Sequence, residues 1–143
     1  LGNGTFDHNS YASPDSVNSI KWNNLHDEVY QNVYDYYKGL IAFRKAHPVL
    51  RLTSAYEILS HVVPVHTERS HVSVFHVNGD FPGETAKDLL LIFSASEKEE
   101  TFALPEGKWN LCIDGETAGT ETIRVVENML TVPPICAMVL VKE

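Results

Sequence analysis

Leu89-Leu90-Leu91-Ile92-Phe93 is a run of five apolar residues with no polar side chain for either face of an extended backbone. A strand with one face in water alternates apolar and polar residues, so this continuous run predicts a central strand that is buried on both faces. Shorter apolar or alternating segments flank it, and turn residues separate them. The further predicted strands are 72–77, 101–104, 109–113, 123–125, 129–132 and 135–141. Many short strands at close spacing indicate an antiparallel β-sandwich.

Two of these strands carry finer predictions. In one, Val72-Ser73-Val74 alternates and Phe75-His76-Val77 continues in the opposite phase, which predicts a bulge. In the other, Trp109, Leu111 and Ile113 recur at a spacing of two, so we expect them on one face of the strand. Trp109 is then expected to pack in the core and not to serve as a stacking platform for sugar.

One long helix precedes the strands. A three-to-four spacing between Asp27 and His47, as on one side of an amphipathic helix, is seen for Val29, Val33, Tyr36 or Tyr37, Leu40, Ile41 and Arg44. Acidic residues begin this segment and basic residues dominate its second half, which complements the helix dipole. Pro48 is expected to end the helix.

The segments on either side of this helix define the organisation of the chain. Residues 1–24 are rich in Asn, Ser, Asp and Gly, which predicts a long loop. After the helix, Ser54-Ala55-Tyr56-Glu57 has the capping-box pattern, and a short helix is expected from about Ala55 to Ser60. A domain boundary is expected near residues 48–54.

Composition and charge limit the functional classes. The chain of 143 residues has 43% hydrophobic and 21% charged residues, as globular proteins do, and a formal net charge of −8. An acidic surface repels phosphate backbones and anionic lipids, so nucleic acid and membrane surfaces are poor partners. No run of about twenty apolar residues predicts a membrane span. Neutral ligands such as sugars are unaffected by this charge.

The two cysteines are too few for a disulfide scaffold. Cys112 and Cys136 each lie in an apolar, strand-like run, and we expect both to be buried thiols. A disulfide between them requires neighbouring strands, which the sequence leaves open. His61, His66, His71 and His76 alternate faces if extended and do not predict a metal site.

Three segments resemble type I pullulanases, the starch-debranching enzymes of the alpha-amylase superfamily. Asn9-Ser10-Tyr11, followed by Ser13-Pro14-Asp15-Ser16-Val17-Asn18 and then Trp22, is similar to a run that these enzymes carry after the eighth barrel strand. The segment from Tyr36 to Pro48, with its Gly-Leu-Ile-x-x-Arg-x-x-His-Pro ending, resembles the final barrel helix. Thr53-Ser54-Ala55-x-Glu57-Ile58 resembles the entry to the C-terminal β-domain.

The resemblance implies a (β/α) barrel end over residues 1–50 and a C-terminal β-sandwich over 51–143. It also implies a parent enzyme that hydrolyses α-1,6-glucosidic bonds in pullulan, amylopectin and limit dextrins. Such enzymes retain the anomeric configuration, with an aspartate nucleophile and a glutamic acid that protonates the leaving oxygen. The resemblance places these carboxylates earlier in the parent, so no residue of this chain is expected to be catalytic. No cofactor is implied, and the chain by itself is expected to be inactive.

Sugar recognition is expected in the N-terminal loop. Asn9, Tyr11, Asp15 and Asn18 offer amide, aromatic and carboxylate groups, which are the groups that bind glucose rings. The resemblance places this loop beside the glucose subsites on the non-reducing side of the cleaved bond. The alternative is that Asn9, Asp15 and Asn18 are turn and cap residues that hold the loop together. Trp22 is expected to pack the loop against the following helix.

Two other functional classes remain open. A stand-alone β-sandwich module would bind α-glucan without hydrolysing it, and a purely structural domain would neither bind nor cleave. Retention on immobilised amylopectin, lost on Tyr11→Ala or Trp109→Ala, would favour the binding module. Within the enzyme interpretation, the remainder of the barrel is the partner of the chain. The tyrosines of the long helix and Leu40-Ile41 would then form an exposed apolar patch in its absence.

Overall fold

The computed structural model describes residues 7–143, so the first six residues of the predicted loop lie outside the described part. The chain divides into two compact units, an N-terminal unit (Leu1–Tyr34) and a C-terminal unit (Asp35–Glu143). Helix α2 (Glu28–Ala46) begins in the first and ends in the second. Within residues 7–143, no helix has both the length and the apolar character that crossing a membrane requires.

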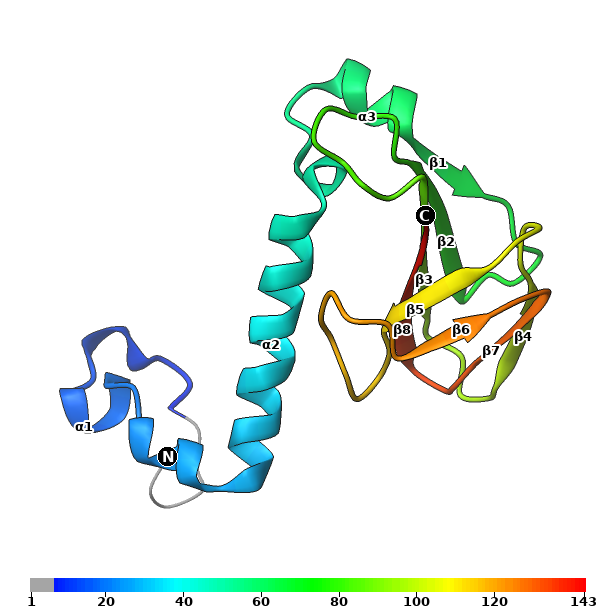
Figure 1. The fold of residues 1–143 in the computed structure, drawn as a ribbon. Helices are drawn as coiled ribbons and strands as arrows, with labels where there is room; N and C mark the ends of the chain where they lie inside the picture. Colours follow the sequence, from blue (N-terminus) through cyan, green and yellow to red (C-terminus); the bar gives the residue numbers. More distant parts are fainter. Residues whose placement is uncertain (1–6) are drawn as a thin grey trace. The chain divides into compact units, whose positions relative to one another are not determined.

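The N-terminal unit is built from short helical turns. They are η1 (Ser10–Ala12), α1 (Asp15–Asn18) and η2 (Trp22–His26), coloured blue in Figure 1. The prediction of a loop is correct in that the described residues of this unit include no strand, but it misses these turns. Pro14 occupies the N-cap of α1 and Asp15 its first turn, where a negative charge favours the helical dipole.

The C-terminal unit contains two antiparallel sheets. A six-stranded sheet has the order β1-β2-β3-β8-β5-β6, and a two-stranded sheet pairs β4 with β7 (Figure 1). The elements are η3 (Pro48–Arg51), α3 (Ala55–His61), β1 (Val62–Val65), β2 (Val72–Asn78), β3 (Asp88–Ser94), β4 (Glu100–Ala103), β5 (Trp109–Ile113), β6 (Arg124–Val126), β7 (Met129–Val132) and β8 (Cys136–Lys142). The predicted antiparallel β fold after one long helix is confirmed.

The central strands of the six-stranded sheet are largely buried on both faces, which explains the apolar run in β3. Leu90 and Ile92 point into a sheet–sheet core, where the two-stranded sheet supplies Leu130 and Val132. Leu89 points the other way, into a helix–sheet core completed by side chains of α2. The central position of β3, between β2 and β8, follows from this double burial.

The bulge predicted in β2 is wrong. The register between β2 and β3 is unbroken from Val72↔Ser94 to Asn78↔Asp88. Val72 and Val74 enter the sheet–sheet core, and Val77 enters the helix–sheet core on the opposite face. The change of phase in the sequence therefore reflects two cores that cover different ends of one regular strand.

A register shift lies instead in β5, between Leu111 and Ile113. Trp109 and Leu111 point into the sheet–sheet core as predicted, but Ile113 turns to the helix–sheet core, so the prediction of one shared face is wrong for Ile113. The indole of Trp109 is 1% exposed, and its Nε1 donates a hydrogen bond to the Pro105 carbonyl at 2.9 Å. The core role predicted for Trp109 is confirmed.

Strand β1 is absent from the sequence-based prediction. It directly follows α3, whose predicted capping box is present between Ser54 and Glu57. Pro64 lacks an N–H group and is tolerated here because β1 is an edge strand. Cys112 and Cys136 are buried free thiols, as expected, and burial raises the pKa of both.

Helix α2 is confirmed, but its predicted apolar stripe is only partly buried. Leu40 and Phe43 pack in the helix–sheet core, and Phe43 is 2% exposed. Tyr37 and Ile41 stay 63% and 56% exposed. The buried side of α2 thus covers the sheet of its own unit, and a second apolar side remains in solvent.

The close contact between α2 and the segment after β5 depends on Gly39. A Cβ at position 39 would overlap the backbone carbonyl of Ala118. One turn earlier, the Tyr36 hydroxyl donates a hydrogen bond to the Asp114 carbonyl at 2.8 Å. A side chain larger than hydrogen at position 39 would push this helix away from the segment that holds it.

A second contact holds the end of α2. The His47 ring packs on Phe43 with centroids 4.3 Å apart, and its Nδ1 lies 2.7 Å from Oε1 of Glu84, a side chain with no exposed surface. Burial alone would raise the pKa of Glu84. Hydrogen bonds from the Ala86 N–H and from His47, with a weaker one from the Val49 N–H, outweigh burial and hold this pKa below its ordinary value.

We expect Gly39→Ala to destabilise the protein by about 1–3 kcal/mol, because relief of the overlap requires α2 to move from the sheet. Helix propensity alone would give the opposite sign, since alanine favours a helix over glycine. Gly119→Ala is the matched control, because the nearest atom to its Cβ would be 4.0 Å away. Urea unfolding of both variants measures the difference, and equal stabilities would refute the close-contact argument.

We expect Glu84→Gln to cost about 1–3 kcal/mol at neutral pH, since it weakens charge-assisted hydrogen bonds in a buried site. Glu84 has a lowered pKa in the folded state, so its contribution is complete above the unfolded pKa, about 4.3, and is lost as the pH falls through the folded value. Urea midpoints of wild type and variant should therefore converge at acidic pH. Glu97→Gln, at an exposed position, is the control. A difference in urea midpoint between wild type and Glu84→Gln that persists at low pH would contradict this role of the Glu84 carboxylate.

Candidate functional site

The four sugar-binding candidates all lie in the N-terminal unit. Asn9 is the N-cap of η1, Tyr11 lies within η1, and Asp15 and Asn18 are the first and last residues of α1. All four are exposed, and Tyr11 is exposed to 96%. The short helical turns therefore gather the amide, aromatic and carboxylate groups of the prediction within one small surface unit.

The side-chain amide of Asn18 holds this unit together. Its Nδ2 donates hydrogen bonds to the carbonyl oxygens of Ser10 at 2.7 Å and Ser13 at 2.9 Å. Both amide hydrogens are thus used to tie α1 to η1. This arrangement favours the alternative reading of Asn18, as a scaffold residue of the loop.

Two residues that the sequence analysis did not single out have similar roles. The Lys21 ammonium group donates to the Ser16 carbonyl at 2.8 Å, to the Ser19 hydroxyl at 2.7 Å and more weakly to the Asp15 carbonyl. The Asp7 carboxylate accepts from the Ser13 hydroxyl and the Asn9 N–H, and these two bonds lower its pKa. The spacing of two between Asp7 and Asn9 is an Asx-turn signal that could have found the second contact.

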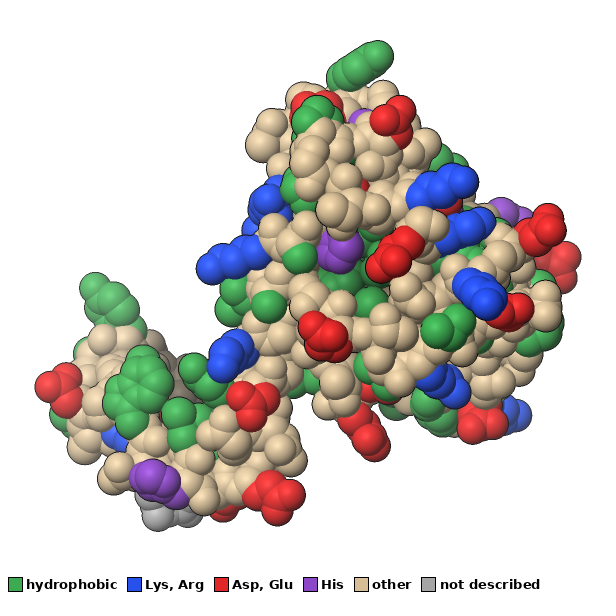
Figure 2. All heavy atoms as spheres, viewed as in Figure 1, with side chains coloured by type: hydrophobic (Ala, Val, Ile, Leu, Met, Phe, Trp, Pro, Cys, Tyr) green, Lys and Arg blue, Asp and Glu red, His purple; other side chains and the backbone are tan. Residues whose placement is uncertain are grey.

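Trp22 is more exposed than a packing role requires. It is the first residue of η2, and 64% of its surface is exposed, so packing of the loop covers only the smaller part of this side chain. Its neighbour Ile20 is 68% exposed. Figure 2 shows hydrophobic side chains gathered on the visible face of this unit. The unit thus exposes aromatic and aliphatic side chains among many polar ones, and several of its polar groups bond to one another.

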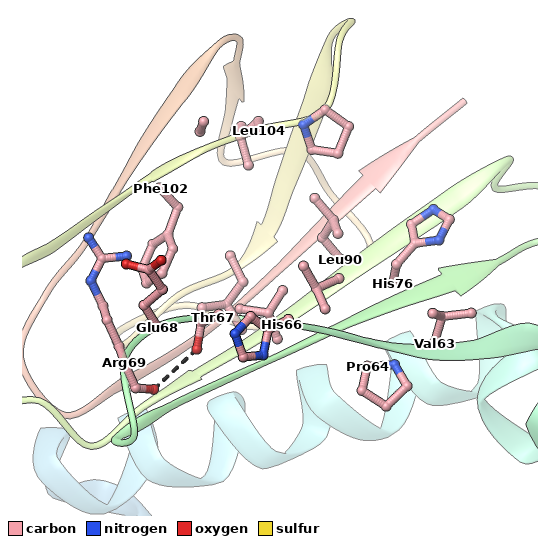
Figure 3. Close-up of a pocket in the computed structure, with 15 residues that line it drawn as sticks. Val63, Pro64, His66, Thr67, Glu68, Arg69, His76, Leu90, Phe102 and Leu104 are labelled. Atoms are coloured by element: carbon pink, nitrogen blue, oxygen red, sulfur yellow. Dashed lines mark hydrogen bonds between the residues drawn. The ribbon is translucent and has the colours of Figure 1, made fainter.

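The C-terminal unit has a groove of about 1050 Å³ between its two sheets (Figure 3). Val63, Leu90 and other aliphatic residues of β1, β2 and β3 form the floor. Phe102 and Leu104, in β4 and just after it, form the facing wall. The groove exists because the two-stranded sheet covers only part of the six-stranded one.

The chemistry of this groove does not suit a sugar. The guanidinium carbon of Arg69 lies 4.7 Å from the centroid of the Phe102 ring and covers it. Arg69 is fixed there by Glu100, with Nε and Oε2 2.7 Å apart, and by the Thr101 carbonyl. The lining also contains polar side chains, among them His66, Thr67 and Glu68, but the Phe102 ring under Arg69 is not free to stack on a glucose ring.

His71 and His76 each contact a carboxylate and not another histidine. His71 Nε2 is 3.0 Å from Oε1 of Glu100, and His76 Nε2 is 2.9 Å from Oδ1 of Asp88. Hydrogen bonds from His71 and Ser96 lower the pKa of Glu100. Residues 7–143 contain no group of three or more His, Cys, Asp or Glu side chains arranged to hold a metal ion.

The chain is similar to known proteins in both sequence and structure. Residues 58–117 match the family model described as the all-beta domain of pullulanase. A curated pullulanase of Bacillus subtilis (strain 168) is 33% identical over 97 residues, which are 68% of this chain and 13% of that protein. The chain thus spans about one eighth of this relative.

Solved structures agree with this match. The pullulanase from Bacillus acidopullulyticus superposes with a TM-score of 0.85 at 25% identity, over 95% of this chain and 16% of that one. The type I pullulanase from Bacillus subtilis str. 168, complexed with maltose, gives 0.79 at 27% identity, over 94% and 18%. The pullulanase from Anoxybacillus sp. LM18-11, complexed with maltotetraose, gives 0.78 at 25% identity, over 94% and 18%. The resemblance carried by the sequence motifs is confirmed.

Proposed function

The chain contains the all-beta domain of a pullulanase, and we propose that it forms the C-terminal part of an enzyme that hydrolyses α-1,6-glucosidic branch linkages. The observation that carries this proposal is the match of nearly the whole chain to about one sixth of the solved pullulanases. In this proposal the catalytic aspartate and glutamic acid lie in the preceding barrel. The reaction retains the anomeric configuration through a covalent glycosyl-enzyme intermediate.

In this proposal, residues 1–50 form the last loop and helix of the barrel, and residues 51–143 form the β-sandwich. The sandwich stabilises the barrel by holding its final helix. Support comes from Phe43 of α2 and from His47, which directly follows this helix, because both are buried within the C-terminal unit. The exposed Tyr37 and Ile41 leave a second apolar side for the remainder of the barrel.

The proposed substrates are pullulan, amylopectin and branched maltooligosaccharides. Relatives complexed with maltose and maltotetraose support an α-glucan ligand for the parent enzyme. Asn9, Tyr11 and Asp15 are proposed to border the sugar cleft, with Asn18 holding the loop in shape and lending one amide oxygen. A glucan-binding module without a barrel is less well supported, since Trp109 is buried and Arg69 covers Phe102.

The chain alone is expected to release no reducing sugar from pullulan above the blank, because the proposed catalytic carboxylates lie outside it. The decisive companion measurement is the DNA sequence immediately upstream of the codon for Leu1. An open frame that encodes a barrel with the Asp, Glu and Asp motifs would support the proposal. A start codon or a leader peptide directly upstream, or turnover by the chain alone, would overturn it.

We expect the isolated chain to self-associate through the exposed side of α2. Leu40, which we expected in this patch, packs in the helix–sheet core, so Tyr37 and Ile41 carry the prediction. Light scattering over a concentration series should show a mass that rises with concentration in wild type and rises less in Ile41→Gln. Leu59→Gln, which removes a 79% exposed leucine from α3, is the control. A monomer at every concentration would count against this patch.

A further inference from the structure

We propose that Glu100 is a clamp that keeps one end of the groove between the two sheets closed. It does so by holding the Arg69 guanidinium group over the aromatic ring of Phe102. Release of this carboxylate frees Arg69 and opens the ring to a small apolar molecule. The inference is independent of the proposed function, because every contact that carries it lies within the C-terminal unit.

The Glu100 carboxylate links the two sheets. Its Oε2 lies 2.7 Å from Nε of Arg69, and its Oε1 lies 3.0 Å from Nε2 of His71. Both partners come from the segment between β1 and β2 (66–71), which belongs to the six-stranded sheet, whereas Glu100 begins β4 of the two-stranded sheet. The Ser96 hydroxyl, just after β3, donates to the same Oε1 at 2.9 Å. One side chain thus fixes the 66–71 segment to β4.

Arg69 is oriented on the ring by more than one contact. Its guanidinium carbon lies 4.7 Å from the centroid of the Phe102 ring, and its Nη2 donates a hydrogen bond to the Thr101 carbonyl at 3.3 Å. A planar guanidinium group can stack on an aromatic face and pair with a carboxylate at the same time. The side chain of Arg69 is 41% exposed and that of Glu100 only 16%, so the carboxylate anchors a cover that itself faces solvent.

The covered ring is continuous with an apolar surface. Phe102 packs against the sheet–sheet core, and Val74 and Leu104 line the same groove. Figure 3 shows Arg69 beside Phe102, with Leu90 further along the groove. Without its cover, this end offers an aromatic face joined to aliphatic side chains, which suits a flat, uncharged, apolar molecule. The neutral dye Nile red is such a molecule and serves as the probe.

The first test is heteronuclear NMR of the ¹⁵N-labelled chain. We expect the Nε–H of Arg69 to give a resolved, slowly exchanging resonance, because it donates to Glu100. Glu100→Gln should accelerate its exchange with water about tenfold, since a neutral amide is a weaker acceptor than a carboxylate. Glu99→Gln changes the exposed neighbouring residue and is the matched control, in which this exchange should stay as in wild type.

The second test is a fluorescence titration with Nile red. Glu100→Gln and Arg69→Ala should each bind the dye about tenfold more tightly than wild type, because both remove the cover from the Phe102 ring. Addition of Phe102→Leu to Arg69→Ala should reverse most of this gain. Glu99→Gln is again expected to behave as wild type.

The outcomes decide between a local clamp and a general stabilising contact. Unchanged Nε–H exchange and unchanged dye binding in Glu100→Gln would overturn the clamp. Equally accelerated exchange at the amide of Leu140, which is fully buried in β8, would show a general loss of stability and would also overturn it. Arg69→Ala retains the His71–Glu100 contact, so dye binding no tighter than in wild type would refute the role of Arg69 as the cover.

Discussion

The attachment of helix α2 to the six-stranded sheet is the constraint on which the rest of the C-terminal unit depends. Gly39 allows the helix backbone to approach Ala118, and Phe43 fills the helix–sheet core below it. The His47–Glu84 pair then fixes the end of the helix to the segment between β2 and β3. With this face covered, β3 can be apolar on both sides, and the sheet can take its central position between a helix and a second sheet.

This attachment gives a structural role to the Gly-Leu-Ile-x-x-Arg-x-x-His-Pro motif at the end of the helix. In this chain Gly39 serves a close backbone contact, Leu40 a core position and His47 a buried contact with Glu84. All three residues make contacts within the C-terminal unit. The ending therefore describes how a helix is joined to the sandwich, while the opposite side of the same helix, with Tyr37 and Ile41, stays free for another partner.

The N-terminal unit shows how a polar loop can present apolar groups. Its Asn, Asp, Ser and Lys side chains satisfy backbone and hydroxyl groups within the unit, with Asn18 and Lys21 as the main donors. Tyr11 and Trp22 nevertheless stay exposed, to 96% and 64%. Residue type alone suggested amide, aromatic and carboxylate groups for sugar recognition, whereas the hydrogen bonds show that the Asn18 amide hydrogens are used within the unit.

The sequence by itself determined the existence and kind of most elements: the long helix, the capped α3, the buried β3 and the antiparallel class. These rest on local periodicity and on capping side chains within a few residues, which the chain carries wherever it is placed. Only the tertiary structure decided the regular register of β2, the shift in β5 that turns Ile113 to the other core, the edge strand β1 with its Pro64, and the exposure of Trp22. Each of these depends on which distant segment covers a given face, and no local pattern contains that information.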